Sequence, residues 1–221
     1  MKKEKCDPIL GEQIKKYLLY LGLETPMIES KYTEDEKVEK IKEHYLDIMK
    51  ILGLDYTNDS MVDTPKRIAK LMVKETMYGL NYNYFPKIMT FENSFHDAGM
   101  VVEKGIKVNS LCSHHFVPTI GHAVIAYIPN KKILGLSKLN RCVDFFARRP
   151  QEQERFTMQL HATLNYILDT DDVAVYVDAK HLCVSWRGAL DPDSKFVTAK
   201  LSGSFMNNSL LRNEFYSIAR N

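Results

Sequence analysis

The spacing of apolar residues changes once along the chain, close to Phe85 and Pro86, and this change limits the possible folds. Before it, apolar residues recur every three to four positions, which is the spacing of one helix face. After it, residues 105–112 and 122–129 are rich in β-branched and aromatic side chains and alternate roughly between apolar and polar positions, as strands do. The chain therefore combines a helical part with a sheet.

Three helices are predicted in the first part. The first covers residues 9–21. The second starts after Thr33, a typical cap residue that three acidic residues follow. The third has Asp63 or Thr64 as its cap and Pro65 at its first helical position, and it ends at Gly79.

The second part predicts an α+β fold, with an antiparallel sheet and a helix pair on one of its faces. The expected elements are strands 105–112 and 122–129, helices 137–147 and 151–168, strands 172–186 and 195–205, and helix 210–220. We expect three regions: a partly helical N-terminal extension (1–34), a helical region (35–86) and the sheet-containing domain (87–221).

Composition argues against several classes of protein. The formal net charge of +2 on 221 residues is nearly neutral, and no basic stripe with interleaved aromatic residues favours a nucleic-acid partner. No apolar run approaches ~18 residues, so no membrane span is expected. The charged N-terminus is not followed by an apolar secretory segment, and we therefore expect a cytoplasmic protein. Its four cysteines are then not expected to form a disulfide framework.

The predicted strand near residue 181 carries reactive groups at every second position. Side chains alternate between the two faces of a strand. One face would hold reactive groups and the other would face the core: His181, Cys183, Ser185 and Arg187 on the first, and Leu182, Val184 and Trp186 on the second.

A second group of metal-binding side chains lies between the first two strands. Cys112 and His115 have Cys-x-x-His spacing, and Cys183 could supply a third ligand from a neighbouring strand. Zinc suits thiolate and imidazole ligands, and three protein ligands plus water are typical of a catalytic zinc site. The neighbouring His114 would point elsewhere and could face a substrate. The alternative is a pair of strand residues with an unrelated thiol.

The start of helix 137–147 is a candidate phosphate site. Ser137 can cap the helix, and Lys138 and Arg141 lie near its positive end, where cations oppose the helix dipole unless an anion binds. Arg67 and Lys70 could extend this basic pocket. The alternative is ordinary solvated surface charge. Glu154 is a candidate for a guanine edge, because a carboxylate can accept two N–H bonds.

Six segments together resemble the GTP cyclohydrolase I family, which are zinc enzymes that convert GTP to dihydroneopterin triphosphate. They occur in the family's order between about residue 35 and the C-terminus: "DTPKRIAK", "FPKI", "CSHHFVP", "AYIPNKKILGLSKLNR", "FARRPQEQERFT" and "VDAKHLCVSWRG". The resemblance implies the T-fold over 87–221, GTP as the substrate, Zn²⁺ as the cofactor, and a toroidal homodecamer with active sites between subunits.

The resemblance also implies roles for single residues. Cys112, His115 and Cys183 fall on the zinc ligands, and His114 and His181 fall on the catalytic histidines. Glu154 falls on the guanine anchor, with Gln153 beside it. The triphosphate-contacting positions are Ser137, Lys138, Arg141, Arg187, Arg67 and Lys70.

Two departures from the family pattern leave alternatives open. Ser113 replaces the acid of the usual Cys-Glu-His-His, and the usual Ser-x-Thr-x-Thr is reduced to Ser194, Phe196 and Thr198. The first could alter the groups that orient the zinc ligands. One alternative is a related T-fold enzyme acting on another pterin or deazapurine. The other is a non-catalytic paralogue that zinc stabilises.

Overall fold

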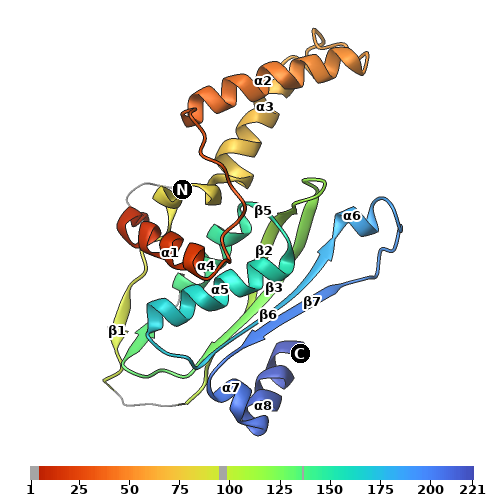
Figure 1. Ribbon diagram of the computed structural model, residues 1–221. Coiled ribbons are helices and arrows are strands. Elements are labelled where there is room, and N and C mark those ends of the chain that lie inside the picture. The colour runs from red at the N-terminus through yellow and green to blue at the C-terminus, as the bar shows by residue number, and fades with distance from the viewer. Residues whose placement is uncertain (1–4, 95–98, 136) are drawn as a thin grey trace.

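A five-stranded sheet forms the centre of the computed structural model, which describes residues 5–94, 99–135 and 137–221 (Figure 1). The strand order is β5-β2-β3-β6-β7. The long strands are antiparallel to their neighbours, and only the short β5 runs parallel to β2. The strands are β2 (Val101–Cys112), β3 (Pro118–Tyr127), β5 (Pro150–Gln151), β6 (Val173–His181) and β7 (Phe196–Leu201).

Helices cover both faces of this sheet. On one face, α4 (Ser137–Ala147) and α5 (Gln153–Leu168) enclose the larger apolar core, which includes Phe146 and Leu160. This helix pair and the antiparallel sheet confirm the predicted α+β class and are consistent with the T-fold. On the other face, α7 (Ser204–Asn207) and α8 (Ser209–Arg220) enclose a smaller core that includes Phe205 and Phe215. The sequence predicted α8, whereas the covering of a second face was not predicted.

The first helices lie where the sequence predicted them. α1 (Pro8–Tyr20) packs against α5, and its Ile14 and Leu18 are fully buried in the larger core. α2 (Glu34–Ile51) begins with the expected cap: Thr33 Oγ1 accepts from the Glu36 N–H at 3.3 Å, and the Glu36 carboxylate accepts from the Thr33 N–H at 2.7 Å. α2 and α3 (Thr64–Lys70) pack together and project away from the sheet (Figure 1).

The third predicted helix is regular only in its first part. A π-helical segment, Leu71–Thr76, follows α3, and two short 3₁₀ turns follow at Tyr78–Leu80 and Tyr82–Tyr84. Gly79 lies so close to the end of α4 that a Cβ atom would come within 2.1 Å of the Phe145 carbonyl oxygen. Its N–H donates to the Arg148 carbonyl at 2.9 Å. The chain therefore bends at this glycine to pack against α4.

The prediction that a strand runs from 172 to 186 is wrong in its last part. β6 ends at His181, and a helical turn, α6 (Leu182–Ser185), replaces the expected extension. The reason is that the neighbouring strands end here. β3 begins at Pro118, so the last residue of β6 that it pairs with is His181, and the last residue of β6 that β7 pairs with is Ala179. Without a neighbouring strand, the Leu182 carbonyl is satisfied locally by the Trp186 N–H at 2.9 Å. Trp186, expected in the core, is 74% exposed.

A small second sheet was not predicted. β1 (Thr90–Glu92) pairs with β4 (Lys132–Leu134) in antiparallel register. Within the described ranges, no helix is long and apolar enough to cross a membrane.

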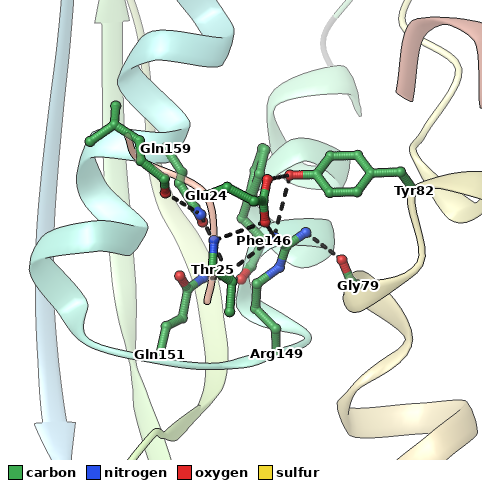
Figure 2. Close-up of polar contacts among 9 residues, drawn as sticks. Glu24, Thr25, Gly79, Tyr82, Phe146, Arg149, Gln151 and Gln159 are labelled. Carbon is green, nitrogen blue, oxygen red and sulfur yellow. Dashed lines mark hydrogen bonds and ion pairs between the residues drawn. The ribbon is translucent and has the colours of Figure 1, made fainter. Parts of the chain in front are cut away.

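The segment after α1 is held by a buried arginine, Arg149, which lies between the end of α4 and β5. Arg149 is fully buried, and its guanidinium pairs with the Glu24 carboxylate at 3.1 Å (Figure 2). The same group donates to the Gly79 carbonyl and lies over the rings of Phe145 and Phe146. The residues after Arg149 lead directly into β5 and α5, so this contact ties the N-terminal segment to the chain that enters the candidate site.

Candidate metal centre and catalytic site

Three potential metal ligands converge where β2 ends. The Sγ atoms of Cys112 and Cys183 and one ring nitrogen of His115 lie within 4.8 Å of one another. Cys112 is the last residue of β2, His115 lies in the turn that follows, and Cys183 lies in α6. Sequence reasoning placed Cys183 on a strand. The helical turn nevertheless brings its sulfur to the other two ligands.

The turn between β2 and β3 shapes this group. The Phe116 N–H donates to the Cys112 carbonyl at 3.0 Å, and the Cys112 N–H donates to the Val117 carbonyl at 2.9 Å. Phe116 adopts a left-handed backbone with φ of 52°. This tight return places His115 Nδ1 at 3.7 Å from Cys112 Sγ and points the His115 N–H at the same sulfur, at 3.3 Å.

The surroundings of the two sulfurs shift their pKa values in opposite directions. Burial by itself would raise the pKa of Cys112, but hydrogen bonds from the backbone N–H groups of His115, His114 and Val117 outweigh it and lower the pKa. Burial raises the pKa of Cys183, and the neighbouring Cys112 raises it further. Cys112 is therefore the first of the pair to become a thiolate, the form that binds metals.

The two adjacent histidines differ in their contacts. Their ring centroids lie 6.3 Å apart and the rings are inclined at 58°, so the two imidazoles do not stack. His115 Nε2 accepts a hydrogen bond from Arg187 Nη1 at 2.9 Å. His114 is exposed to solvent. One ring thus belongs to the metal group, and the other remains open to a ligand.

His181, the last residue of β6, is held between α5 and β3. Its Nε2 lies 2.9 Å from Gln153 Oε1, and its Nδ1 lies 3.4 Å from Thr119 Oγ1. Burial lowers the pKa of His181, and the negative charge of Glu154 partly opposes that shift. A small cavity lined by Thr119, Gln153 and His181, among others, lies beside this ring.

Glu154 and Glu152 lie two residues apart at the start of α5 and differ in exposure and in their contacts. Glu154 is exposed in the first turn of α5. Glu152 occupies the N-cap position of the same helix, and its carboxylate accepts from Ser113 Oγ at 3.4 Å and pairs with Arg155 at 2.9 Å. Sequence reasoning did not single out Glu152. The hydrogen bond from Ser113, which the sequence marked as a departure from the Cys-Glu-His-His pattern, brings the Glu152 carboxylate to this turn.

The predicted phosphate contacts fall in separate places. Ser137, Lys138 and Arg141 lie on the first turns of α4, and Arg187 follows α6 beside the candidate metal ligands. Arg67 and Lys70 lie on α3, in the projecting helix pair, where Arg67 pairs with Asp63 at 3.6 Å. Their roles as triphosphate contacts stay predictions.

The fold and site define a class: an α+β protein with a candidate Cys₂His metal centre and a half-buried histidine, His181, two residues before one of its ligands, which are the groups of a hydrolytic metalloenzyme. The family model described as GTP cyclohydrolase I matches residues 41–220.

Curated relatives named GTP cyclohydrolase 1 are similar over nearly their whole length. The relative from Vibrio vulnificus (strain YJ016) is 48% identical over 93% of this chain and 94% of its own. That from Vibrio cholerae serotype O1 is 50% identical over 88% of this chain and 89% of its own. That from Shewanella baltica (strain OS185) is 48% identical over 90% and 92%.

The chain therefore belongs to the GTP cyclohydrolase I family. The resemblance noted on six sequence segments is confirmed.

Proposed function

We propose that this chain hydrolyses GTP to 7,8-dihydroneopterin triphosphate and formate with the help of a bound zinc ion. The observation that carries the proposal is the convergence of Cys112, His115 and Cys183 beside His181, in a chain of this family.

The three ligands fit zinc. In a tetrahedral site with Zn–S near 2.3 Å and Zn–N near 2.0–2.1 Å, a sulfur and a nitrogen lie about 3.6 Å apart. Cys112 Sγ and His115 Nδ1 lie 3.7 Å apart. Two thiolates and an imidazole are also the donor types that zinc prefers. The set supplies three protein ligands, as in catalytic zinc sites that keep a position for water.

Zinc binding would also change the role of Arg187. A nitrogen of His115 that binds a metal carries no proton, so the ring proton moves to the other nitrogen. If Nδ1 is the ligand, Nε2 becomes a donor and no longer accepts from Arg187. The guanidinium is then available to an anion, which agrees with its proposed contact to the triphosphate.

The chemistry requires water to attack C8 of guanine. When bound, zinc supplies a Lewis acid that makes water nucleophilic near neutral pH. His181 protonates N7 of the purine and makes C8 electrophilic, so water adds and the imidazole ring opens. A second hydrolysis releases C8 as formate, with His114 carrying protons. The freed amine and the ribose then rearrange and close the pterin ring. Histidine suits both roles because its ordinary pKa lies near the operating pH.

Substrate recognition rests on one carboxylate and several cations. Glu154 accepts two N–H bonds from the guanine edge. The triphosphate stays intact and serves for positioning; its proposed contacts are Ser137, Lys138, Arg141, Arg187, Arg67 and Lys70. We also propose a toroidal homodecamer with active sites between subunits, because the family resemblance implies it. In such an assembly, contacts on α3 could come from a neighbouring copy.

The test is incubation of the purified protein with GTP, with assays for formate and for a fluorescent pterin. Equal turnover of GTP and GMP would favour a related enzyme with another substrate, since the cationic cluster would then have no role. Absence of both products from zinc-loaded protein would favour the non-catalytic paralogue. His114→Ala and His181→Ala should each keep zinc and lose turnover.

A further inference from the structure

Gln153 is buried at the start of α5, and its side-chain amide has partners on both sides. It is 5% exposed. Its Nε2 lies 3.1 Å from the Val177 carbonyl oxygen, 2.9 Å from the Phe196 carbonyl oxygen and 3.1 Å from Thr198 Oγ1. Two of these partners are carbonyl oxygens, which only accept hydrogen bonds, so the amide nitrogen must lie on this side. Both amide hydrogens are thereby used within the protein.

The orientation of this amide determines where His181 carries its proton. With the nitrogen directed at the strands, Oε1 faces His181 Nε2 at 2.9 Å. An amide oxygen only accepts, so Nε2 must carry a hydrogen. In the neutral ring the lone pair then belongs to Nδ1, whose partner is the Thr119 hydroxyl at the longer distance of 3.4 Å.

A pair of threonine hydroxyls fixes the amide in turn. Thr157 Oγ1 lies 2.8 Å from the Gln153 backbone carbonyl, to which it donates its one hydrogen. In the 2.6 Å contact between Thr157 and Thr198, the Thr198 hydroxyl must therefore be the donor. The Thr198 oxygen is left with lone pairs to accept from Gln153 Nε2. In this assignment the donors run from the imidazole through the Gln153 amide on α5 to Thr198 on β7 and back to Thr157, and the two amide hydrogens are shared among three acceptors.

Packing supports the same orientation. The Phe196 ring meets the His181 ring edge to face, with centroids 5.7 Å apart and planes at 83°. Phe196 stands where the family usually has threonine. Its ring limits rotation of the imidazole, while its carbonyl holds the Gln153 amide.

We infer that Gln153, oriented by Thr198 and Thr157, is a positioning residue that keeps His181 in the Nε2–H tautomer and leaves Nδ1 to exchange protons with the substrate. This inference rests on the proposed function for its catalytic consequence, but the tautomer itself does not depend on turnover. It also gives Gln153 a role other than direct substrate contact, because neither amide hydrogen remains for a ligand.

The kinetic test removes one hydroxyl. Thr198→Val keeps the side-chain shape but deletes the acceptor, and we expect kcat to fall by about 2- to 10-fold, the worth of one hydrogen bond. The KM for GTP and the zinc content should stay at the wild-type value, and Thr198→Ser should restore kcat. Thr163→Val is the matched control: Thr163 is fully buried on the same helix, and its hydroxyl has no hydrogen-bond partner within the described part of the chain.

The structural test is solid-state NMR of protein labelled on its histidine rings, which suits a large assembly. The ring ¹³C and ¹⁵N shifts distinguish the two neutral tautomers, and comparison with His181→Ala identifies the His181 signal among the seven histidines. We expect Nε2–H in the wild type and a measurable share of the Nδ1–H tautomer in Thr198→Val, in which two of the three acceptors still hold the amide.

The two tests separate the possible failures. A wild-type His181 with its proton on Nδ1 would overturn the inference, whatever the activity. An unchanged kcat in Thr198→Val, or a Thr163→Val enzyme that loses as much, would overturn the positioning role while GTP turnover still supports the proposed function. If the wild type fails to turn over GTP, the proposed function fails, and the NMR result still decides the tautomer.

Discussion

Replacing Glu24 by glutamine should destabilise the protein far more than its position near the N-terminus suggests. The Glu24 carboxylate lies 3.1 Å from the Arg149 guanidinium. Among the described residues, no other carboxylate pairs with Arg149. The Arg149 side chain is fully buried and that of Glu24 is 8% exposed. Glu24 also accepts from the hydroxyl of Tyr82, a residue whose pKa is raised chiefly by burial (Figure 2).

The magnitude follows from the charge that would be left behind. Removal of one partner from a buried ion pair costs about 3–5 kcal/mol, because the other charge remains buried without compensation. The Gly79 carbonyl and the aromatic rings around the guanidinium offset part of this, so the lower end of the range is expected for Glu24→Gln. For a chain of this size, each kcal/mol shifts Tm by roughly 2–4 °C, so Tm should fall by about 6–12 °C.

Thermal unfolding followed by circular dichroism measures this change. Asp47→Asn is the matched control, because it removes the carboxylate of an ion pair with Lys50 at 2.9 Å in which both side chains are exposed. That pair should contribute little. A Tm for Glu24→Gln within about 2 °C of the wild type would refute the reasoning, since the buried charge would then not need its partner.

Three further predictions concern the metal centre and pH. Cys183→Ser should abolish stoichiometric zinc by elemental analysis, whereas Cys142→Ala should keep it, because Cys142 is a buried core thiol whose pKa burial raises to about 12. A mild oxidant should link Cys112 to Cys183 and release zinc, reversibly with a thiol reductant; peptide mapping that finds both thiols unlinked would contradict this. Burial lowers the pKa of His161 to about 4, with Lys200 adding to the shift. In the unfolded chain His161 takes up a proton as the pH falls below its ordinary pKa near 6.5, whereas in the folded protein it stays neutral until the pH is lower. The free energy of unfolding should therefore fall by about 2 kcal/mol between pH 6.5 and 5 in urea titrations. His161→Gln should flatten that dependence.

Local signals in the sequence predicted much of the fold. The cap at Thr33, the apolar spacing of 137–147 and 151–168 and the alternation of the strands each depend on residues close in the chain, and each is confirmed. The end of β6 was predicted wrongly because the alternating pattern continues after His181 while the strand's partners do not. Pairing depends on where distant strands begin and end, and no local pattern reports it.

In the candidate site, too, local patterns predicted the residue types, and contacts between distant segments could not be predicted. Residue types and Cys-x-x-His spacing pointed to Cys112, His115 and Cys183, although the strand geometry used for Cys183 was wrong. The contacts of Gln153 to β6 and β7 could not be predicted, because they join segments 24 to 45 positions apart. The boundaries at 34/35 and 86/87 stay predictions. Ile14 and Leu18, within the expected extension, lie in the larger core.

The ion pair between Glu24 and Arg149 spans 125 positions, and this separation bears on how the protein is made. A growing chain emerges from the ribosome in sequence order, so α1 and the carboxylate after it appear long before their partners do. Until α4 and α5 have been synthesised, Ile14 and Leu18 have no core to enter and remain exposed to other chains. The segment that carries α1 and Glu24 is thus made before the core it packs into, and it is a part of the chain that needs protection while translation continues.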